Sequence, residues 1–458
     1  MNDTILRTTK SVCPKCLEQI DACLIEKDSC IFLQKSCKDH GNFDILLSRT
    51  PKLYKELDQF YFAISNNKAT VPEYELWPTY RCNIDCTICC FGGQNHEMQY
   101  SEPTCADIED FITEHSQNFY IISGGEPTCR DDLAEIIKTL KKHGKAVTIN
   151  TNGLKLTDIQ YLKKLADAGL DRVNLQFDGF NRQAYKELRR KDYLDAKLEV
   201  IENLRSMKIQ TTFNATIARN LNEDAISELI DFAAKNDFIN GVNFFTICFL
   251  GGARGWSDDK YIMPDEIVDL LEKQTNNIIN KNNVYIFQKL HLAIKAFLKH
   301  KWCFYNQSYL FVRVKESYKP IDRFLNFELA EPWLNKYAKA YKSSGALSSI
   351  YLSIAIFSLF LNIRSVFIIK EILIKSISYF FKTNKYLKGN KFFSVSFSTG
   401  CDPYKFDESI VQNCQNEIIA PSEETESLVN IGSDGLYNMS LEKRHLNKIH
   451  SKNRINNN

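Results

Sequence analysis

Residues 74–275 alternate short apolar runs with helical patterns, and this alternation limits the fold more than any other feature of the chain. One helical pattern places Leu133, Ile136 and Ile137 on a single helix face. Strands separated by helices of this length predict right-handed βαβ units and a parallel sheet. The expected strands are residues 74–80, 119–124, 146–152, 172–178, 210–217 and 241–249.

Six such units predict an α/β fold, a partial (β/α)6 TIM-like barrel over residues 72–300. Active sites of such barrels lie at the carboxyl ends of the strands, where the motifs described below fall. The 458 residues are too many for one compact core, so further domains are expected. These are an N-terminal Cys/His metal-binding domain (1–60), a mainly helical, apolar C-terminal region (301–440) and a disordered tail (441–458).

The chain has 15 cysteines, and its N-terminus lacks the apolar core of an export signal. We therefore expect a cytoplasmic protein whose clustered cysteines bind metal rather than form disulfides. Others, including Cys23, Cys105 and Cys129, are expected to be small buried hydrophobic residues. The net charge of +2 offers no basic footprint for nucleic acid, so no such partner is expected.

Cys82, Cys86 and Cys89 directly follow the first expected strand with C-x3-C-x2-C spacing. Ferredoxin-type runs use C-x2-C-x2-C and zinc sites use paired C-x2-C, so neither pattern fits. This spacing lets one loop hold three corners of a cubane cluster and leaves the fourth iron open for a ligand. The adjacent Cys90 is left over and is expected to pack beside the cluster.

Residues 123–130, SGGEPTCR, end the second expected strand. Gly124 and Gly125 allow a ligand to approach the backbone closely, and Glu126 offers a carboxylate suited to an ammonium group. Further polar side chains follow at later strand ends, where they predict cofactor or substrate contacts or, alternatively, ordinary turn chemistry. These residues are Asn152, Gln176, Asp178 and, more weakly, Asn214.

Together, the cysteine loop and the GGEP stretch resemble the radical S-adenosylmethionine (SAM) enzymes. The resemblance implies a [4Fe–4S] cluster on Cys82, Cys86 and Cys89, with SAM on the open iron and the GGEP stretch at the methionine amino group. It also implies one-electron reduction of SAM to a 5′-deoxyadenosyl radical that abstracts hydrogen from substrate. The electron would come from a reductant such as ferredoxin or flavodoxin.

The N-terminal segment contains two ligand pairs, Cys13-x2-Cys16 and Cys37-x2-His40. Two short pairs separated by a loop predict a tetrahedral S/N site that stabilises a segment too short for its own core. Zinc and mononuclear iron share this geometry. Cys30 or Cys23 is an alternative fourth ligand in place of His40.

The order of motifs over residues 8–325 resembles the tetraether lipid synthase family, with a weaker similarity at residues 402–414. The resemblance implies auxiliary iron–sulfur clusters and radical C–C coupling of alkyl chains. Two residues depart from the family pattern, Thr87 at a usual proline and Cys90 at a usual aromatic residue. One auxiliary cluster is expected, and its candidate ligands are Cys303, Cys401 and Cys414, with Cys248 or the N-terminal set as alternatives.

Residues 343–363 carry no charge, and residues 364–382 are apolar with interspersed Lys and Arg. They predict a buried helix pair or a surface that lies on the cytoplasmic face of a membrane; a true span is a minor alternative. The leading hypothesis is a radical SAM enzyme that joins chains of a lipid-like substrate. The alternatives are a radical SAM enzyme that modifies a peptide or another small substrate, and a non-catalytic metal-stabilised binding module.

Overall fold

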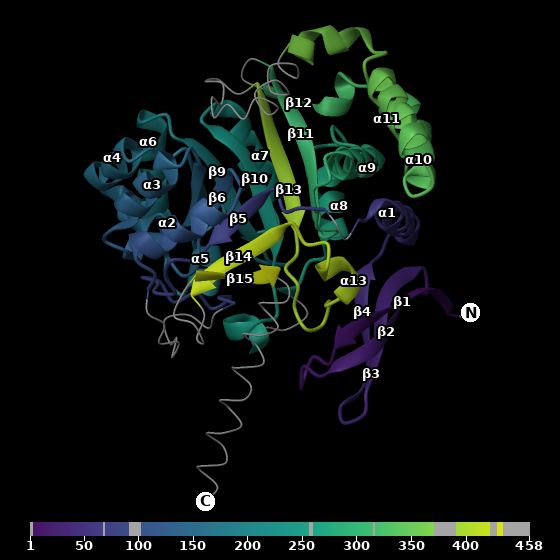
Figure 1. Ribbon diagram of the computed structural model, residues 1–458, viewed down its shortest axis with the longest axis horizontal. Helices are drawn as coiled ribbons and strands as arrows, with labels where there is room; N and C mark the ends of the chain where they lie inside the picture. Colours follow the sequence, from purple (N-terminus) through teal and green to yellow (C-terminus); the bar gives the residue numbers. More distant parts are fainter. Residues whose placement is uncertain are drawn as a thin grey trace, which may run out of the picture.

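The computed structural model describes residues 3–66, 69–90, 102–255, 260–314, 317–370, 391–421 and 428–433. Within these residues the chain forms a small antiparallel sheet at one end and a large, mostly parallel sheet flanked by helices (Figure 1). The expected tail at 441–458 and residues 371–382 of the apolar segment lie outside the described residues.

The small sheet, here called the ribbon, contains four antiparallel strands in chain order. Its first hairpin turns through Asp28 and Ser29, whose φ angles of 50° and 58° give the left-handed turn that suits strand twist. Helix α1 (Pro51–Ile64) then leads to the large sheet. The ribbon strands are β1 (Thr4–Val12), β2 (Gln19–Lys27), β3 (Cys30–Cys37) and β4 (Gly41–Ser48).

The large sheet has the order β12-β11-β13-β10-β9-β8-β7-β6-β5-β14-β15 among the described residues. All strands from β13 to β14 in this order run parallel to one another. Strands β11, β12 and β15, at the two edges, pair antiparallel with their neighbours. Its strands are β5 (Glu73–Leu76), β6 (Phe119–Ile122), β7 (Ala146–Thr151), β8 (Arg172–Gln176), β9 (Gln210–Ile217), β10 (Ile239–Thr246), β11 (Asn306–Val314), β12 (Ser317–Pro320), β13 (Phe392–Ser398), β14 (Asn416–Pro421) and β15 (Leu428–Ser433).

Helices follow most strands and cover the outer face of the sheet (Figure 1). In α3 (Leu133–Lys142) the predicted stripe of Leu133, Ile136 and Ile137 is fully buried in the core. The other helices are α2 (Cys105–Glu114), α4 (Ile159–Asp167), α5 (Arg182–Arg189), α6 (Leu194–Ser206), α7 (Ala225–Lys235), α8 (Pro264–Gln274), α9 (Lys281–Phe297), α10 (Phe327–Ala340), α11 (Gly345–Leu359) and α13 (Glu408–Val411). Single 3-10 turns are η1 (Pro127–Cys129), η2 (Leu154–Thr157), η3 (Gly251–Gly255), η5 (Ile321–Arg323) and η6 (Ile363–Ser365).

The α/β partial barrel is confirmed, and its six predicted strands correspond to β5–β10. The expectation of a mainly helical region at 301–440 is incomplete, because β11–β15 all come from that region. Strand β13 extends one edge of the parallel sheet beside β10, and β14 extends the other edge beside β5. β13 alternates serine with larger apolar residues, and β14 has a short apolar core of Ile418, Ile419 and Ala420; each segment pairs with an existing edge of the sheet.

Residues 345–370, here called the apolar arm, comprise α11 and a following short helix on the side of α9 and α10 (Figure 1). Ile363 is 92% exposed, and Phe357, Val366 and Phe367 each exceed 60%. No single described helix has the length and hydropathy to span a membrane; Gly345–Leu359 and Ile363–Lys370, bent by 87°, meet that test only as a pair. Neither sequence alternative of full burial nor a straight span fits this arm.

Candidate active site

The loop that carries Cys82, Cys86 and Cys89 lies at the carboxyl end of β5 and is held between two glycine pairs. On one side, Gly125 donates its N–H to Thr79 O (2.9 Å), and a Cβ at Gly125 would lie 2.4 Å from backbone oxygens. On the other side, Gly252 donates to Cys89 O (2.8 Å) and has no room for a Cβ. The GGEP glycines thus allow close approach of backbone to the loop itself.

The departure at Thr87 has a structural role. Thr87 N and Oγ1 donate to Leu188 O at 3.1 and 2.9 Å, and Oγ1 also donates to Glu187 O. These carbonyls belong to the last turn of α5, where backbone acceptors lack helical donors. A proline has no N–H and could not make the first of these bonds. Threonine therefore attaches the cysteine loop to α5.

Glu126 lies beneath the loop rather than facing an open ligand position. Its carboxylate is 1% exposed and accepts hydrogen bonds from Thr128 N (3.1 Å), Thr128 Oγ1 (2.6 Å), Thr151 Oγ1 (2.6 Å) and Asn152 N (2.7 Å). Oε1 accepts three of these bonds and Oε2 accepts one, and the ammonium contact that the sequence predicts for Glu126 remains a prediction. Glu126 joins the end of β6 to the end of β7.

Asn152 connects this network to the cysteine loop. Its side chain donates to Asn83 Oδ1 at 2.7 Å, between Cys82 and Cys86, and accepts from Leu154 N at 3.0 Å. Sequence reasoning placed Asn152 at the site but missed Asn83. The contact with SAM that the sequence predicts for Asn152 remains a prediction.

Asp178 is also internal. Both of its oxygens accept from the guanidinium of Arg189, at 2.8 and 2.9 Å, and one accepts from Thr216 N at 2.9 Å. The Asp178 side chain is fully buried, so it differs from the expected ligand contact by forming a bidentate ion pair. Arg189, which the sequence analysis missed, also hydrogen-bonds the Cys86 thiol. It therefore links α5, the sheet and the loop.

Lys197 of α6 is a second residue that the sequence analysis missed. It is almost fully buried and donates to Gln176 O (2.8 Å), Gln176 Oε1 (2.6 Å) and Asn152 O. Burial lowers the pKa of Lys197 to about 7, against the opposing charge of Asp178. The Gln176 amide also donates to Asp178 at 2.6 Å, so this predicted site residue lies within the same buried network. No sequence motif marks a lysine in the middle of an amphipathic helix.

Asn214 lies in the middle of the inner face of β9. Its side-chain oxygen accepts from Asn243 Nδ2 at 2.9 Å. Both side chains keep partial exposure, unlike Asp178 and Glu126.

The donor set of the loop fits an iron–sulfur cluster. Burial, together with the charges of Glu126, Cys86 and Cys89, raises the pKa of Cys82 to about 12, while the Ile84 N–H opposes this shift. The protein alone thus disfavours the thiolate that a metal ligand must be, whereas the charge of bound iron favours it. The three sulfurs do not gather within 4.8 Å of one another, as ligands of a single ion would. Cys90 packs against the hydrophobic core.

The ribbon contains the one described group of three or more ligands whose donor atoms all lie within 4.8 Å: Cys13, Cys16, Cys37 and His40. His40 Nδ1 is 3.4 Å from the Cys37 sulfur and 3.6 Å from that of Cys13. Three sulfurs and one imidazole around a common centre suit a tetrahedral ion. His40 is therefore the fourth member of the group, and the alternatives Cys23 and Cys30 are excluded from it.

Three further cysteines lie within electrostatic range of Tyr61 in α1. The hydroxyl of buried Tyr61 has a pKa raised by desolvation and then by the charges of Cys303, Cys414 and Cys401. Cys401 follows β13, Cys414 precedes β14 and Cys303 precedes β11, so the three cysteines near Tyr61 come from distant segments of the chain. Cys248 lies beside Gly400, where an added Cβ would be 2.3 Å from its sulfur.

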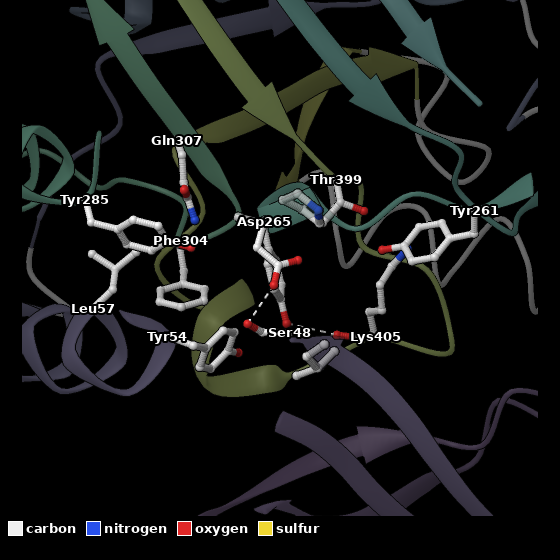
Figure 2. Close-up of a pocket in the computed structure, with 13 residues that line it drawn as sticks. Ser48, Tyr54, Leu57, Tyr261, Asp265, Tyr285, Phe304, Gln307, Thr399 and Lys405 are labelled. Carbon is white, nitrogen blue, oxygen red and sulfur yellow. Dashed lines mark hydrogen bonds between the residues drawn. The ribbon is translucent and has the colours of Figure 1, made fainter. Parts of the chain in front are cut away.

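The ribbon docks on the barrel through a polar seam (Figure 2). Buried Asp265 of α8 accepts from Ser48 Oγ and Arg49 N, each at 2.8 Å, and burial raises its pKa. Lys35 of the ribbon donates to Pro403 O (2.7 Å) and Tyr404 O (2.8 Å), and burial lowers its pKa to about 8. A small pocket at this seam is lined by aromatic side chains, among them Tyr54, Tyr261, Tyr285, Phe304 and Tyr305.

Two family models match the chain. The model described as radical SAM superfamily matches residues 78–233, and the model described as HMPTM N-terminal zinc ribbon domain matches residues 5–49. The second match favours zinc over mononuclear iron for the ribbon site.

Individual proteins also match. A 7,8-dihydro-6-hydroxymethylpterin dimethyltransferase of Methanocaldococcus jannaschii is 31% identical over 366 residues, which cover 70% of this chain and 71% of the relative. A GTP 3′,8-cyclase of Campylobacter jejuni is 29% identical over 203 residues, 43% of this chain and 61% of the cyclase. The solved structure of Streptococcus suis SuiB with its precursor peptide SuiA is 18% identical at a TM-score of 0.40, covering 50% of this chain and 49% of SuiB. A similarity at that level says nothing about substrate.

Proposed function

We propose, from the premise that this chain belongs to the radical SAM superfamily and within it to the family of the M. jannaschii hydroxymethylpterin dimethyltransferase, that it methylates a small pterin-like heterocycle. The observation that carries the proposal is the similarity to that enzyme over 70% of this chain and 71% of the enzyme's length. It favours the small-substrate alternative of the sequence analysis over coupling of alkyl chains.

In this proposal Cys82, Cys86 and Cys89 hold the [4Fe–4S] cluster and the GGEP backbone lies beside SAM. When bound, cluster and SAM supply a 5′-deoxyadenosyl radical, after an electron from a donor such as ferredoxin or flavodoxin. The chain's own groups set the position of the loop: Arg189 through Cys86, Asn152 through Asn83, and Thr87 through α5. The buried network of Glu126, Asp178 and Lys197 fixes the strand ends on which these groups lie.

We also propose one auxiliary iron–sulfur cluster, held by Cys303, Cys401 and Cys414 near Tyr61. Support comes from three thiols of separate segments that all lie near enough to the buried Tyr61 hydroxyl for their charges to raise its pKa. An enzyme with both clusters would contain about eight irons per chain beside the ribbon metal. A content of about four, with an unchanged value after Cys401→Ala, would exclude the auxiliary cluster.

A lipid-like substrate is the second candidate, and the exposed apolar arm is the observation that favours it. Arg364 and Lys370 lie among the exposed apolar side chains of the arm, a combination that suits the surface of an anionic bilayer. We propose that the arm rests on the cytoplasmic face of such a membrane, whichever substrate the barrel takes.

The deciding experiment uses anaerobically reconstituted protein with SAM, a chemical reductant, and either 7,8-dihydro-6-hydroxymethylpterin or a membrane lipid extract. We expect the pterin, and not the extract, to stimulate formation of 5′-deoxyadenosine and methionine from one SAM and to gain the methyl group of a second SAM, which leaves S-adenosylhomocysteine; the reductant supplies two electrons in total. Stimulation by the extract alone would favour the lipid-like substrate over the pterin.

Co-sedimentation of the same protein with anionic vesicles tests the arm separately. Ile363→Asp with Phe367→Asp should weaken vesicle binding at least tenfold, since each fully buried side chain of this kind contributes about 1.5–3 kcal/mol. Ile5→Asp, at a ribbon residue that is 63% exposed, is the matched control. Equal vesicle binding by the wild type, the double variant and Ile5→Asp would show that the arm does not bind membranes.

A further inference from the structure

The two faces of the central parallel strands differ sharply in chemistry. The outward face is apolar and fully buried under helices, as at Val173, Phe213 and Phe244. The opposite face is polar and partly exposed on five neighbouring strands. Its residues are Asn150, Asn174, Gln176, Thr212, Asn214, Asn243, Ser394 and Ser396.

Strand register arranges these polar residues in rows across the sheet. Asn214 pairs with Gln176 on one side and Asn243 on the other, and Asn243 pairs with Ser396. Asn243 lies three residues before the end of β10 at Thr246, about 10 Å below the strand ends at ~3.3 Å per residue. The Asn214–Asn243 pair therefore lies inside the barrel, below the level of the cysteine loop.

The pair makes one hydrogen bond and leaves two groups unused. Asn243 Nδ2 donates to Asn214 Oδ1 at 2.9 Å, and no other side-chain hydrogen bond of either amide occurs among the described residues. The Asn214 amide nitrogen and the Asn243 carbonyl oxygen consequently keep no side-chain partner among the described residues, so two neighbouring strands offer a donor and an acceptor to a ligand. The result is the same if both amides are turned over, because each amide then exchanges its role with its neighbour. Neither free group is sealed from solvent.

An adjacent donor and acceptor complement a ligand edge that carries C=O and N–H on the same side. A ring lactam has such an edge. A trans peptide unit presents these groups on opposite sides, and an alkyl chain has neither. Hydrogen-bonding groups built into a site discriminate strongly against ligands that leave them unpaired.

We propose that Asn214 and Asn243 form the binding site for the lactam edge of a planar heterocyclic substrate inside the barrel. This inference rests on the proposed function, whose substrate class it explains. The pair is a specificity determinant for substrate, and the sequence analysis recognised only one of its members.

Equilibrium dialysis of the reconstituted holoenzyme with SAM tests the pair. The probes are 7,8-dihydro-6-hydroxymethylpterin and a 2,4-diaminopteridine, in which an amino group replaces the lactam carbonyl. We expect the wild-type protein to prefer the lactam at least tenfold. Asn243→Leu should weaken its binding about tenfold, equivalent to ~1.4 kcal/mol, while SAM affinity and iron content stay unchanged.

The isosteric Asn243→Asp replaces the donor by a second acceptor and should reduce or reverse the preference for the lactam. Asn282→Leu, an exposed residue of α9, is the control. Pterin binding that is equal in Asn243→Leu, Asn243→Asp and wild type would overturn the inference and leave the proposed function intact. Joint loss of SAM and pterin affinity in both variants would also overturn it, because the pair would then be structural. Absence of pterin binding by the wild type would overturn the proposed function together with the inference.

Discussion

The two cysteine sites of this protein are built in opposite ways. The ribbon site gathers four donor atoms from two turns of one small sheet, between Cys13 and His40. The barrel loop has three cysteines within eight residues, but its position depends on the GGEP turn, α5 and the segment after β10. A structural ion needs only converging ligands, whereas a reactive cluster also needs an environment around its open position. The difference shows that the ribbon site is local and the catalytic site is a tertiary product.

The largest expected effect on activity comes from a change in the barrel loop alone. Replacement of Cys82, Cys86 or Cys89 by Ala should reduce SAM cleavage by at least about a thousandfold, ~4 kcal/mol in barrier, since each thiolate is expected to hold one iron. Ribbon zinc should be retained. Cys90→Ala should keep most of the activity, because Cys90 packs in the core. Assays of 5′-deoxyadenosine and of iron per chain measure both effects; equal losses in all four variants would contradict the assignment of the loop.

The converse change breaks the ribbon site. Cys13→Ser should release zinc and unfold the ribbon, because structural zinc supplies roughly 10 kcal/mol or more to small domains of this kind. The barrel cluster should keep its visible absorption, since the two sites share no ligand. Zinc content and limited proteolysis report the result, with Cys30→Ser as control outside the ligand group. Loss of the barrel cluster at the same time would mean that the sites are coupled through the Lys35 seam.

A smaller effect is expected on the unfolding free energy, where two neighbouring arginines beside the barrel loop can be compared. Arg189→Met removes a buried partner of Asp178 and should cost about 3–5 kcal/mol of unfolding free energy. Arg190 pairs with Asp85 at 3.2 Å but is 59% exposed, so Arg190→Met should cost about 0–1 kcal/mol. Denaturant unfolding of the two variants measures the difference. Similar costs would show that the ion pair beneath the loop does not stabilise the fold.

Much of the fold and part of the site could be predicted from the sequence. Apolar periodicity located β5–β10, and cysteine spacing identified the ligand group of the ribbon. The roles of Glu126 and Asp178 could not be predicted, because their partners Thr151, Asn152 and Arg189 come from other elements. The Gly251–Gly252 pair did leave a signal, two glycines directly after an expected strand, that would have pointed to the loop.

The sequence by itself determined which side chains can bind metal, because ligand spacing within a short loop is a local property. It also determined the alternation that produces a parallel sheet. Only the tertiary structure decided that carboxylates at strand ends are buried supports, since burial depends on residues far apart in the chain. It likewise decided that β13 and β14 complete the sheet and that the apolar arm remains exposed. Strand pairing and solvent exposure are set by what lies beside a segment in space, which no local pattern records.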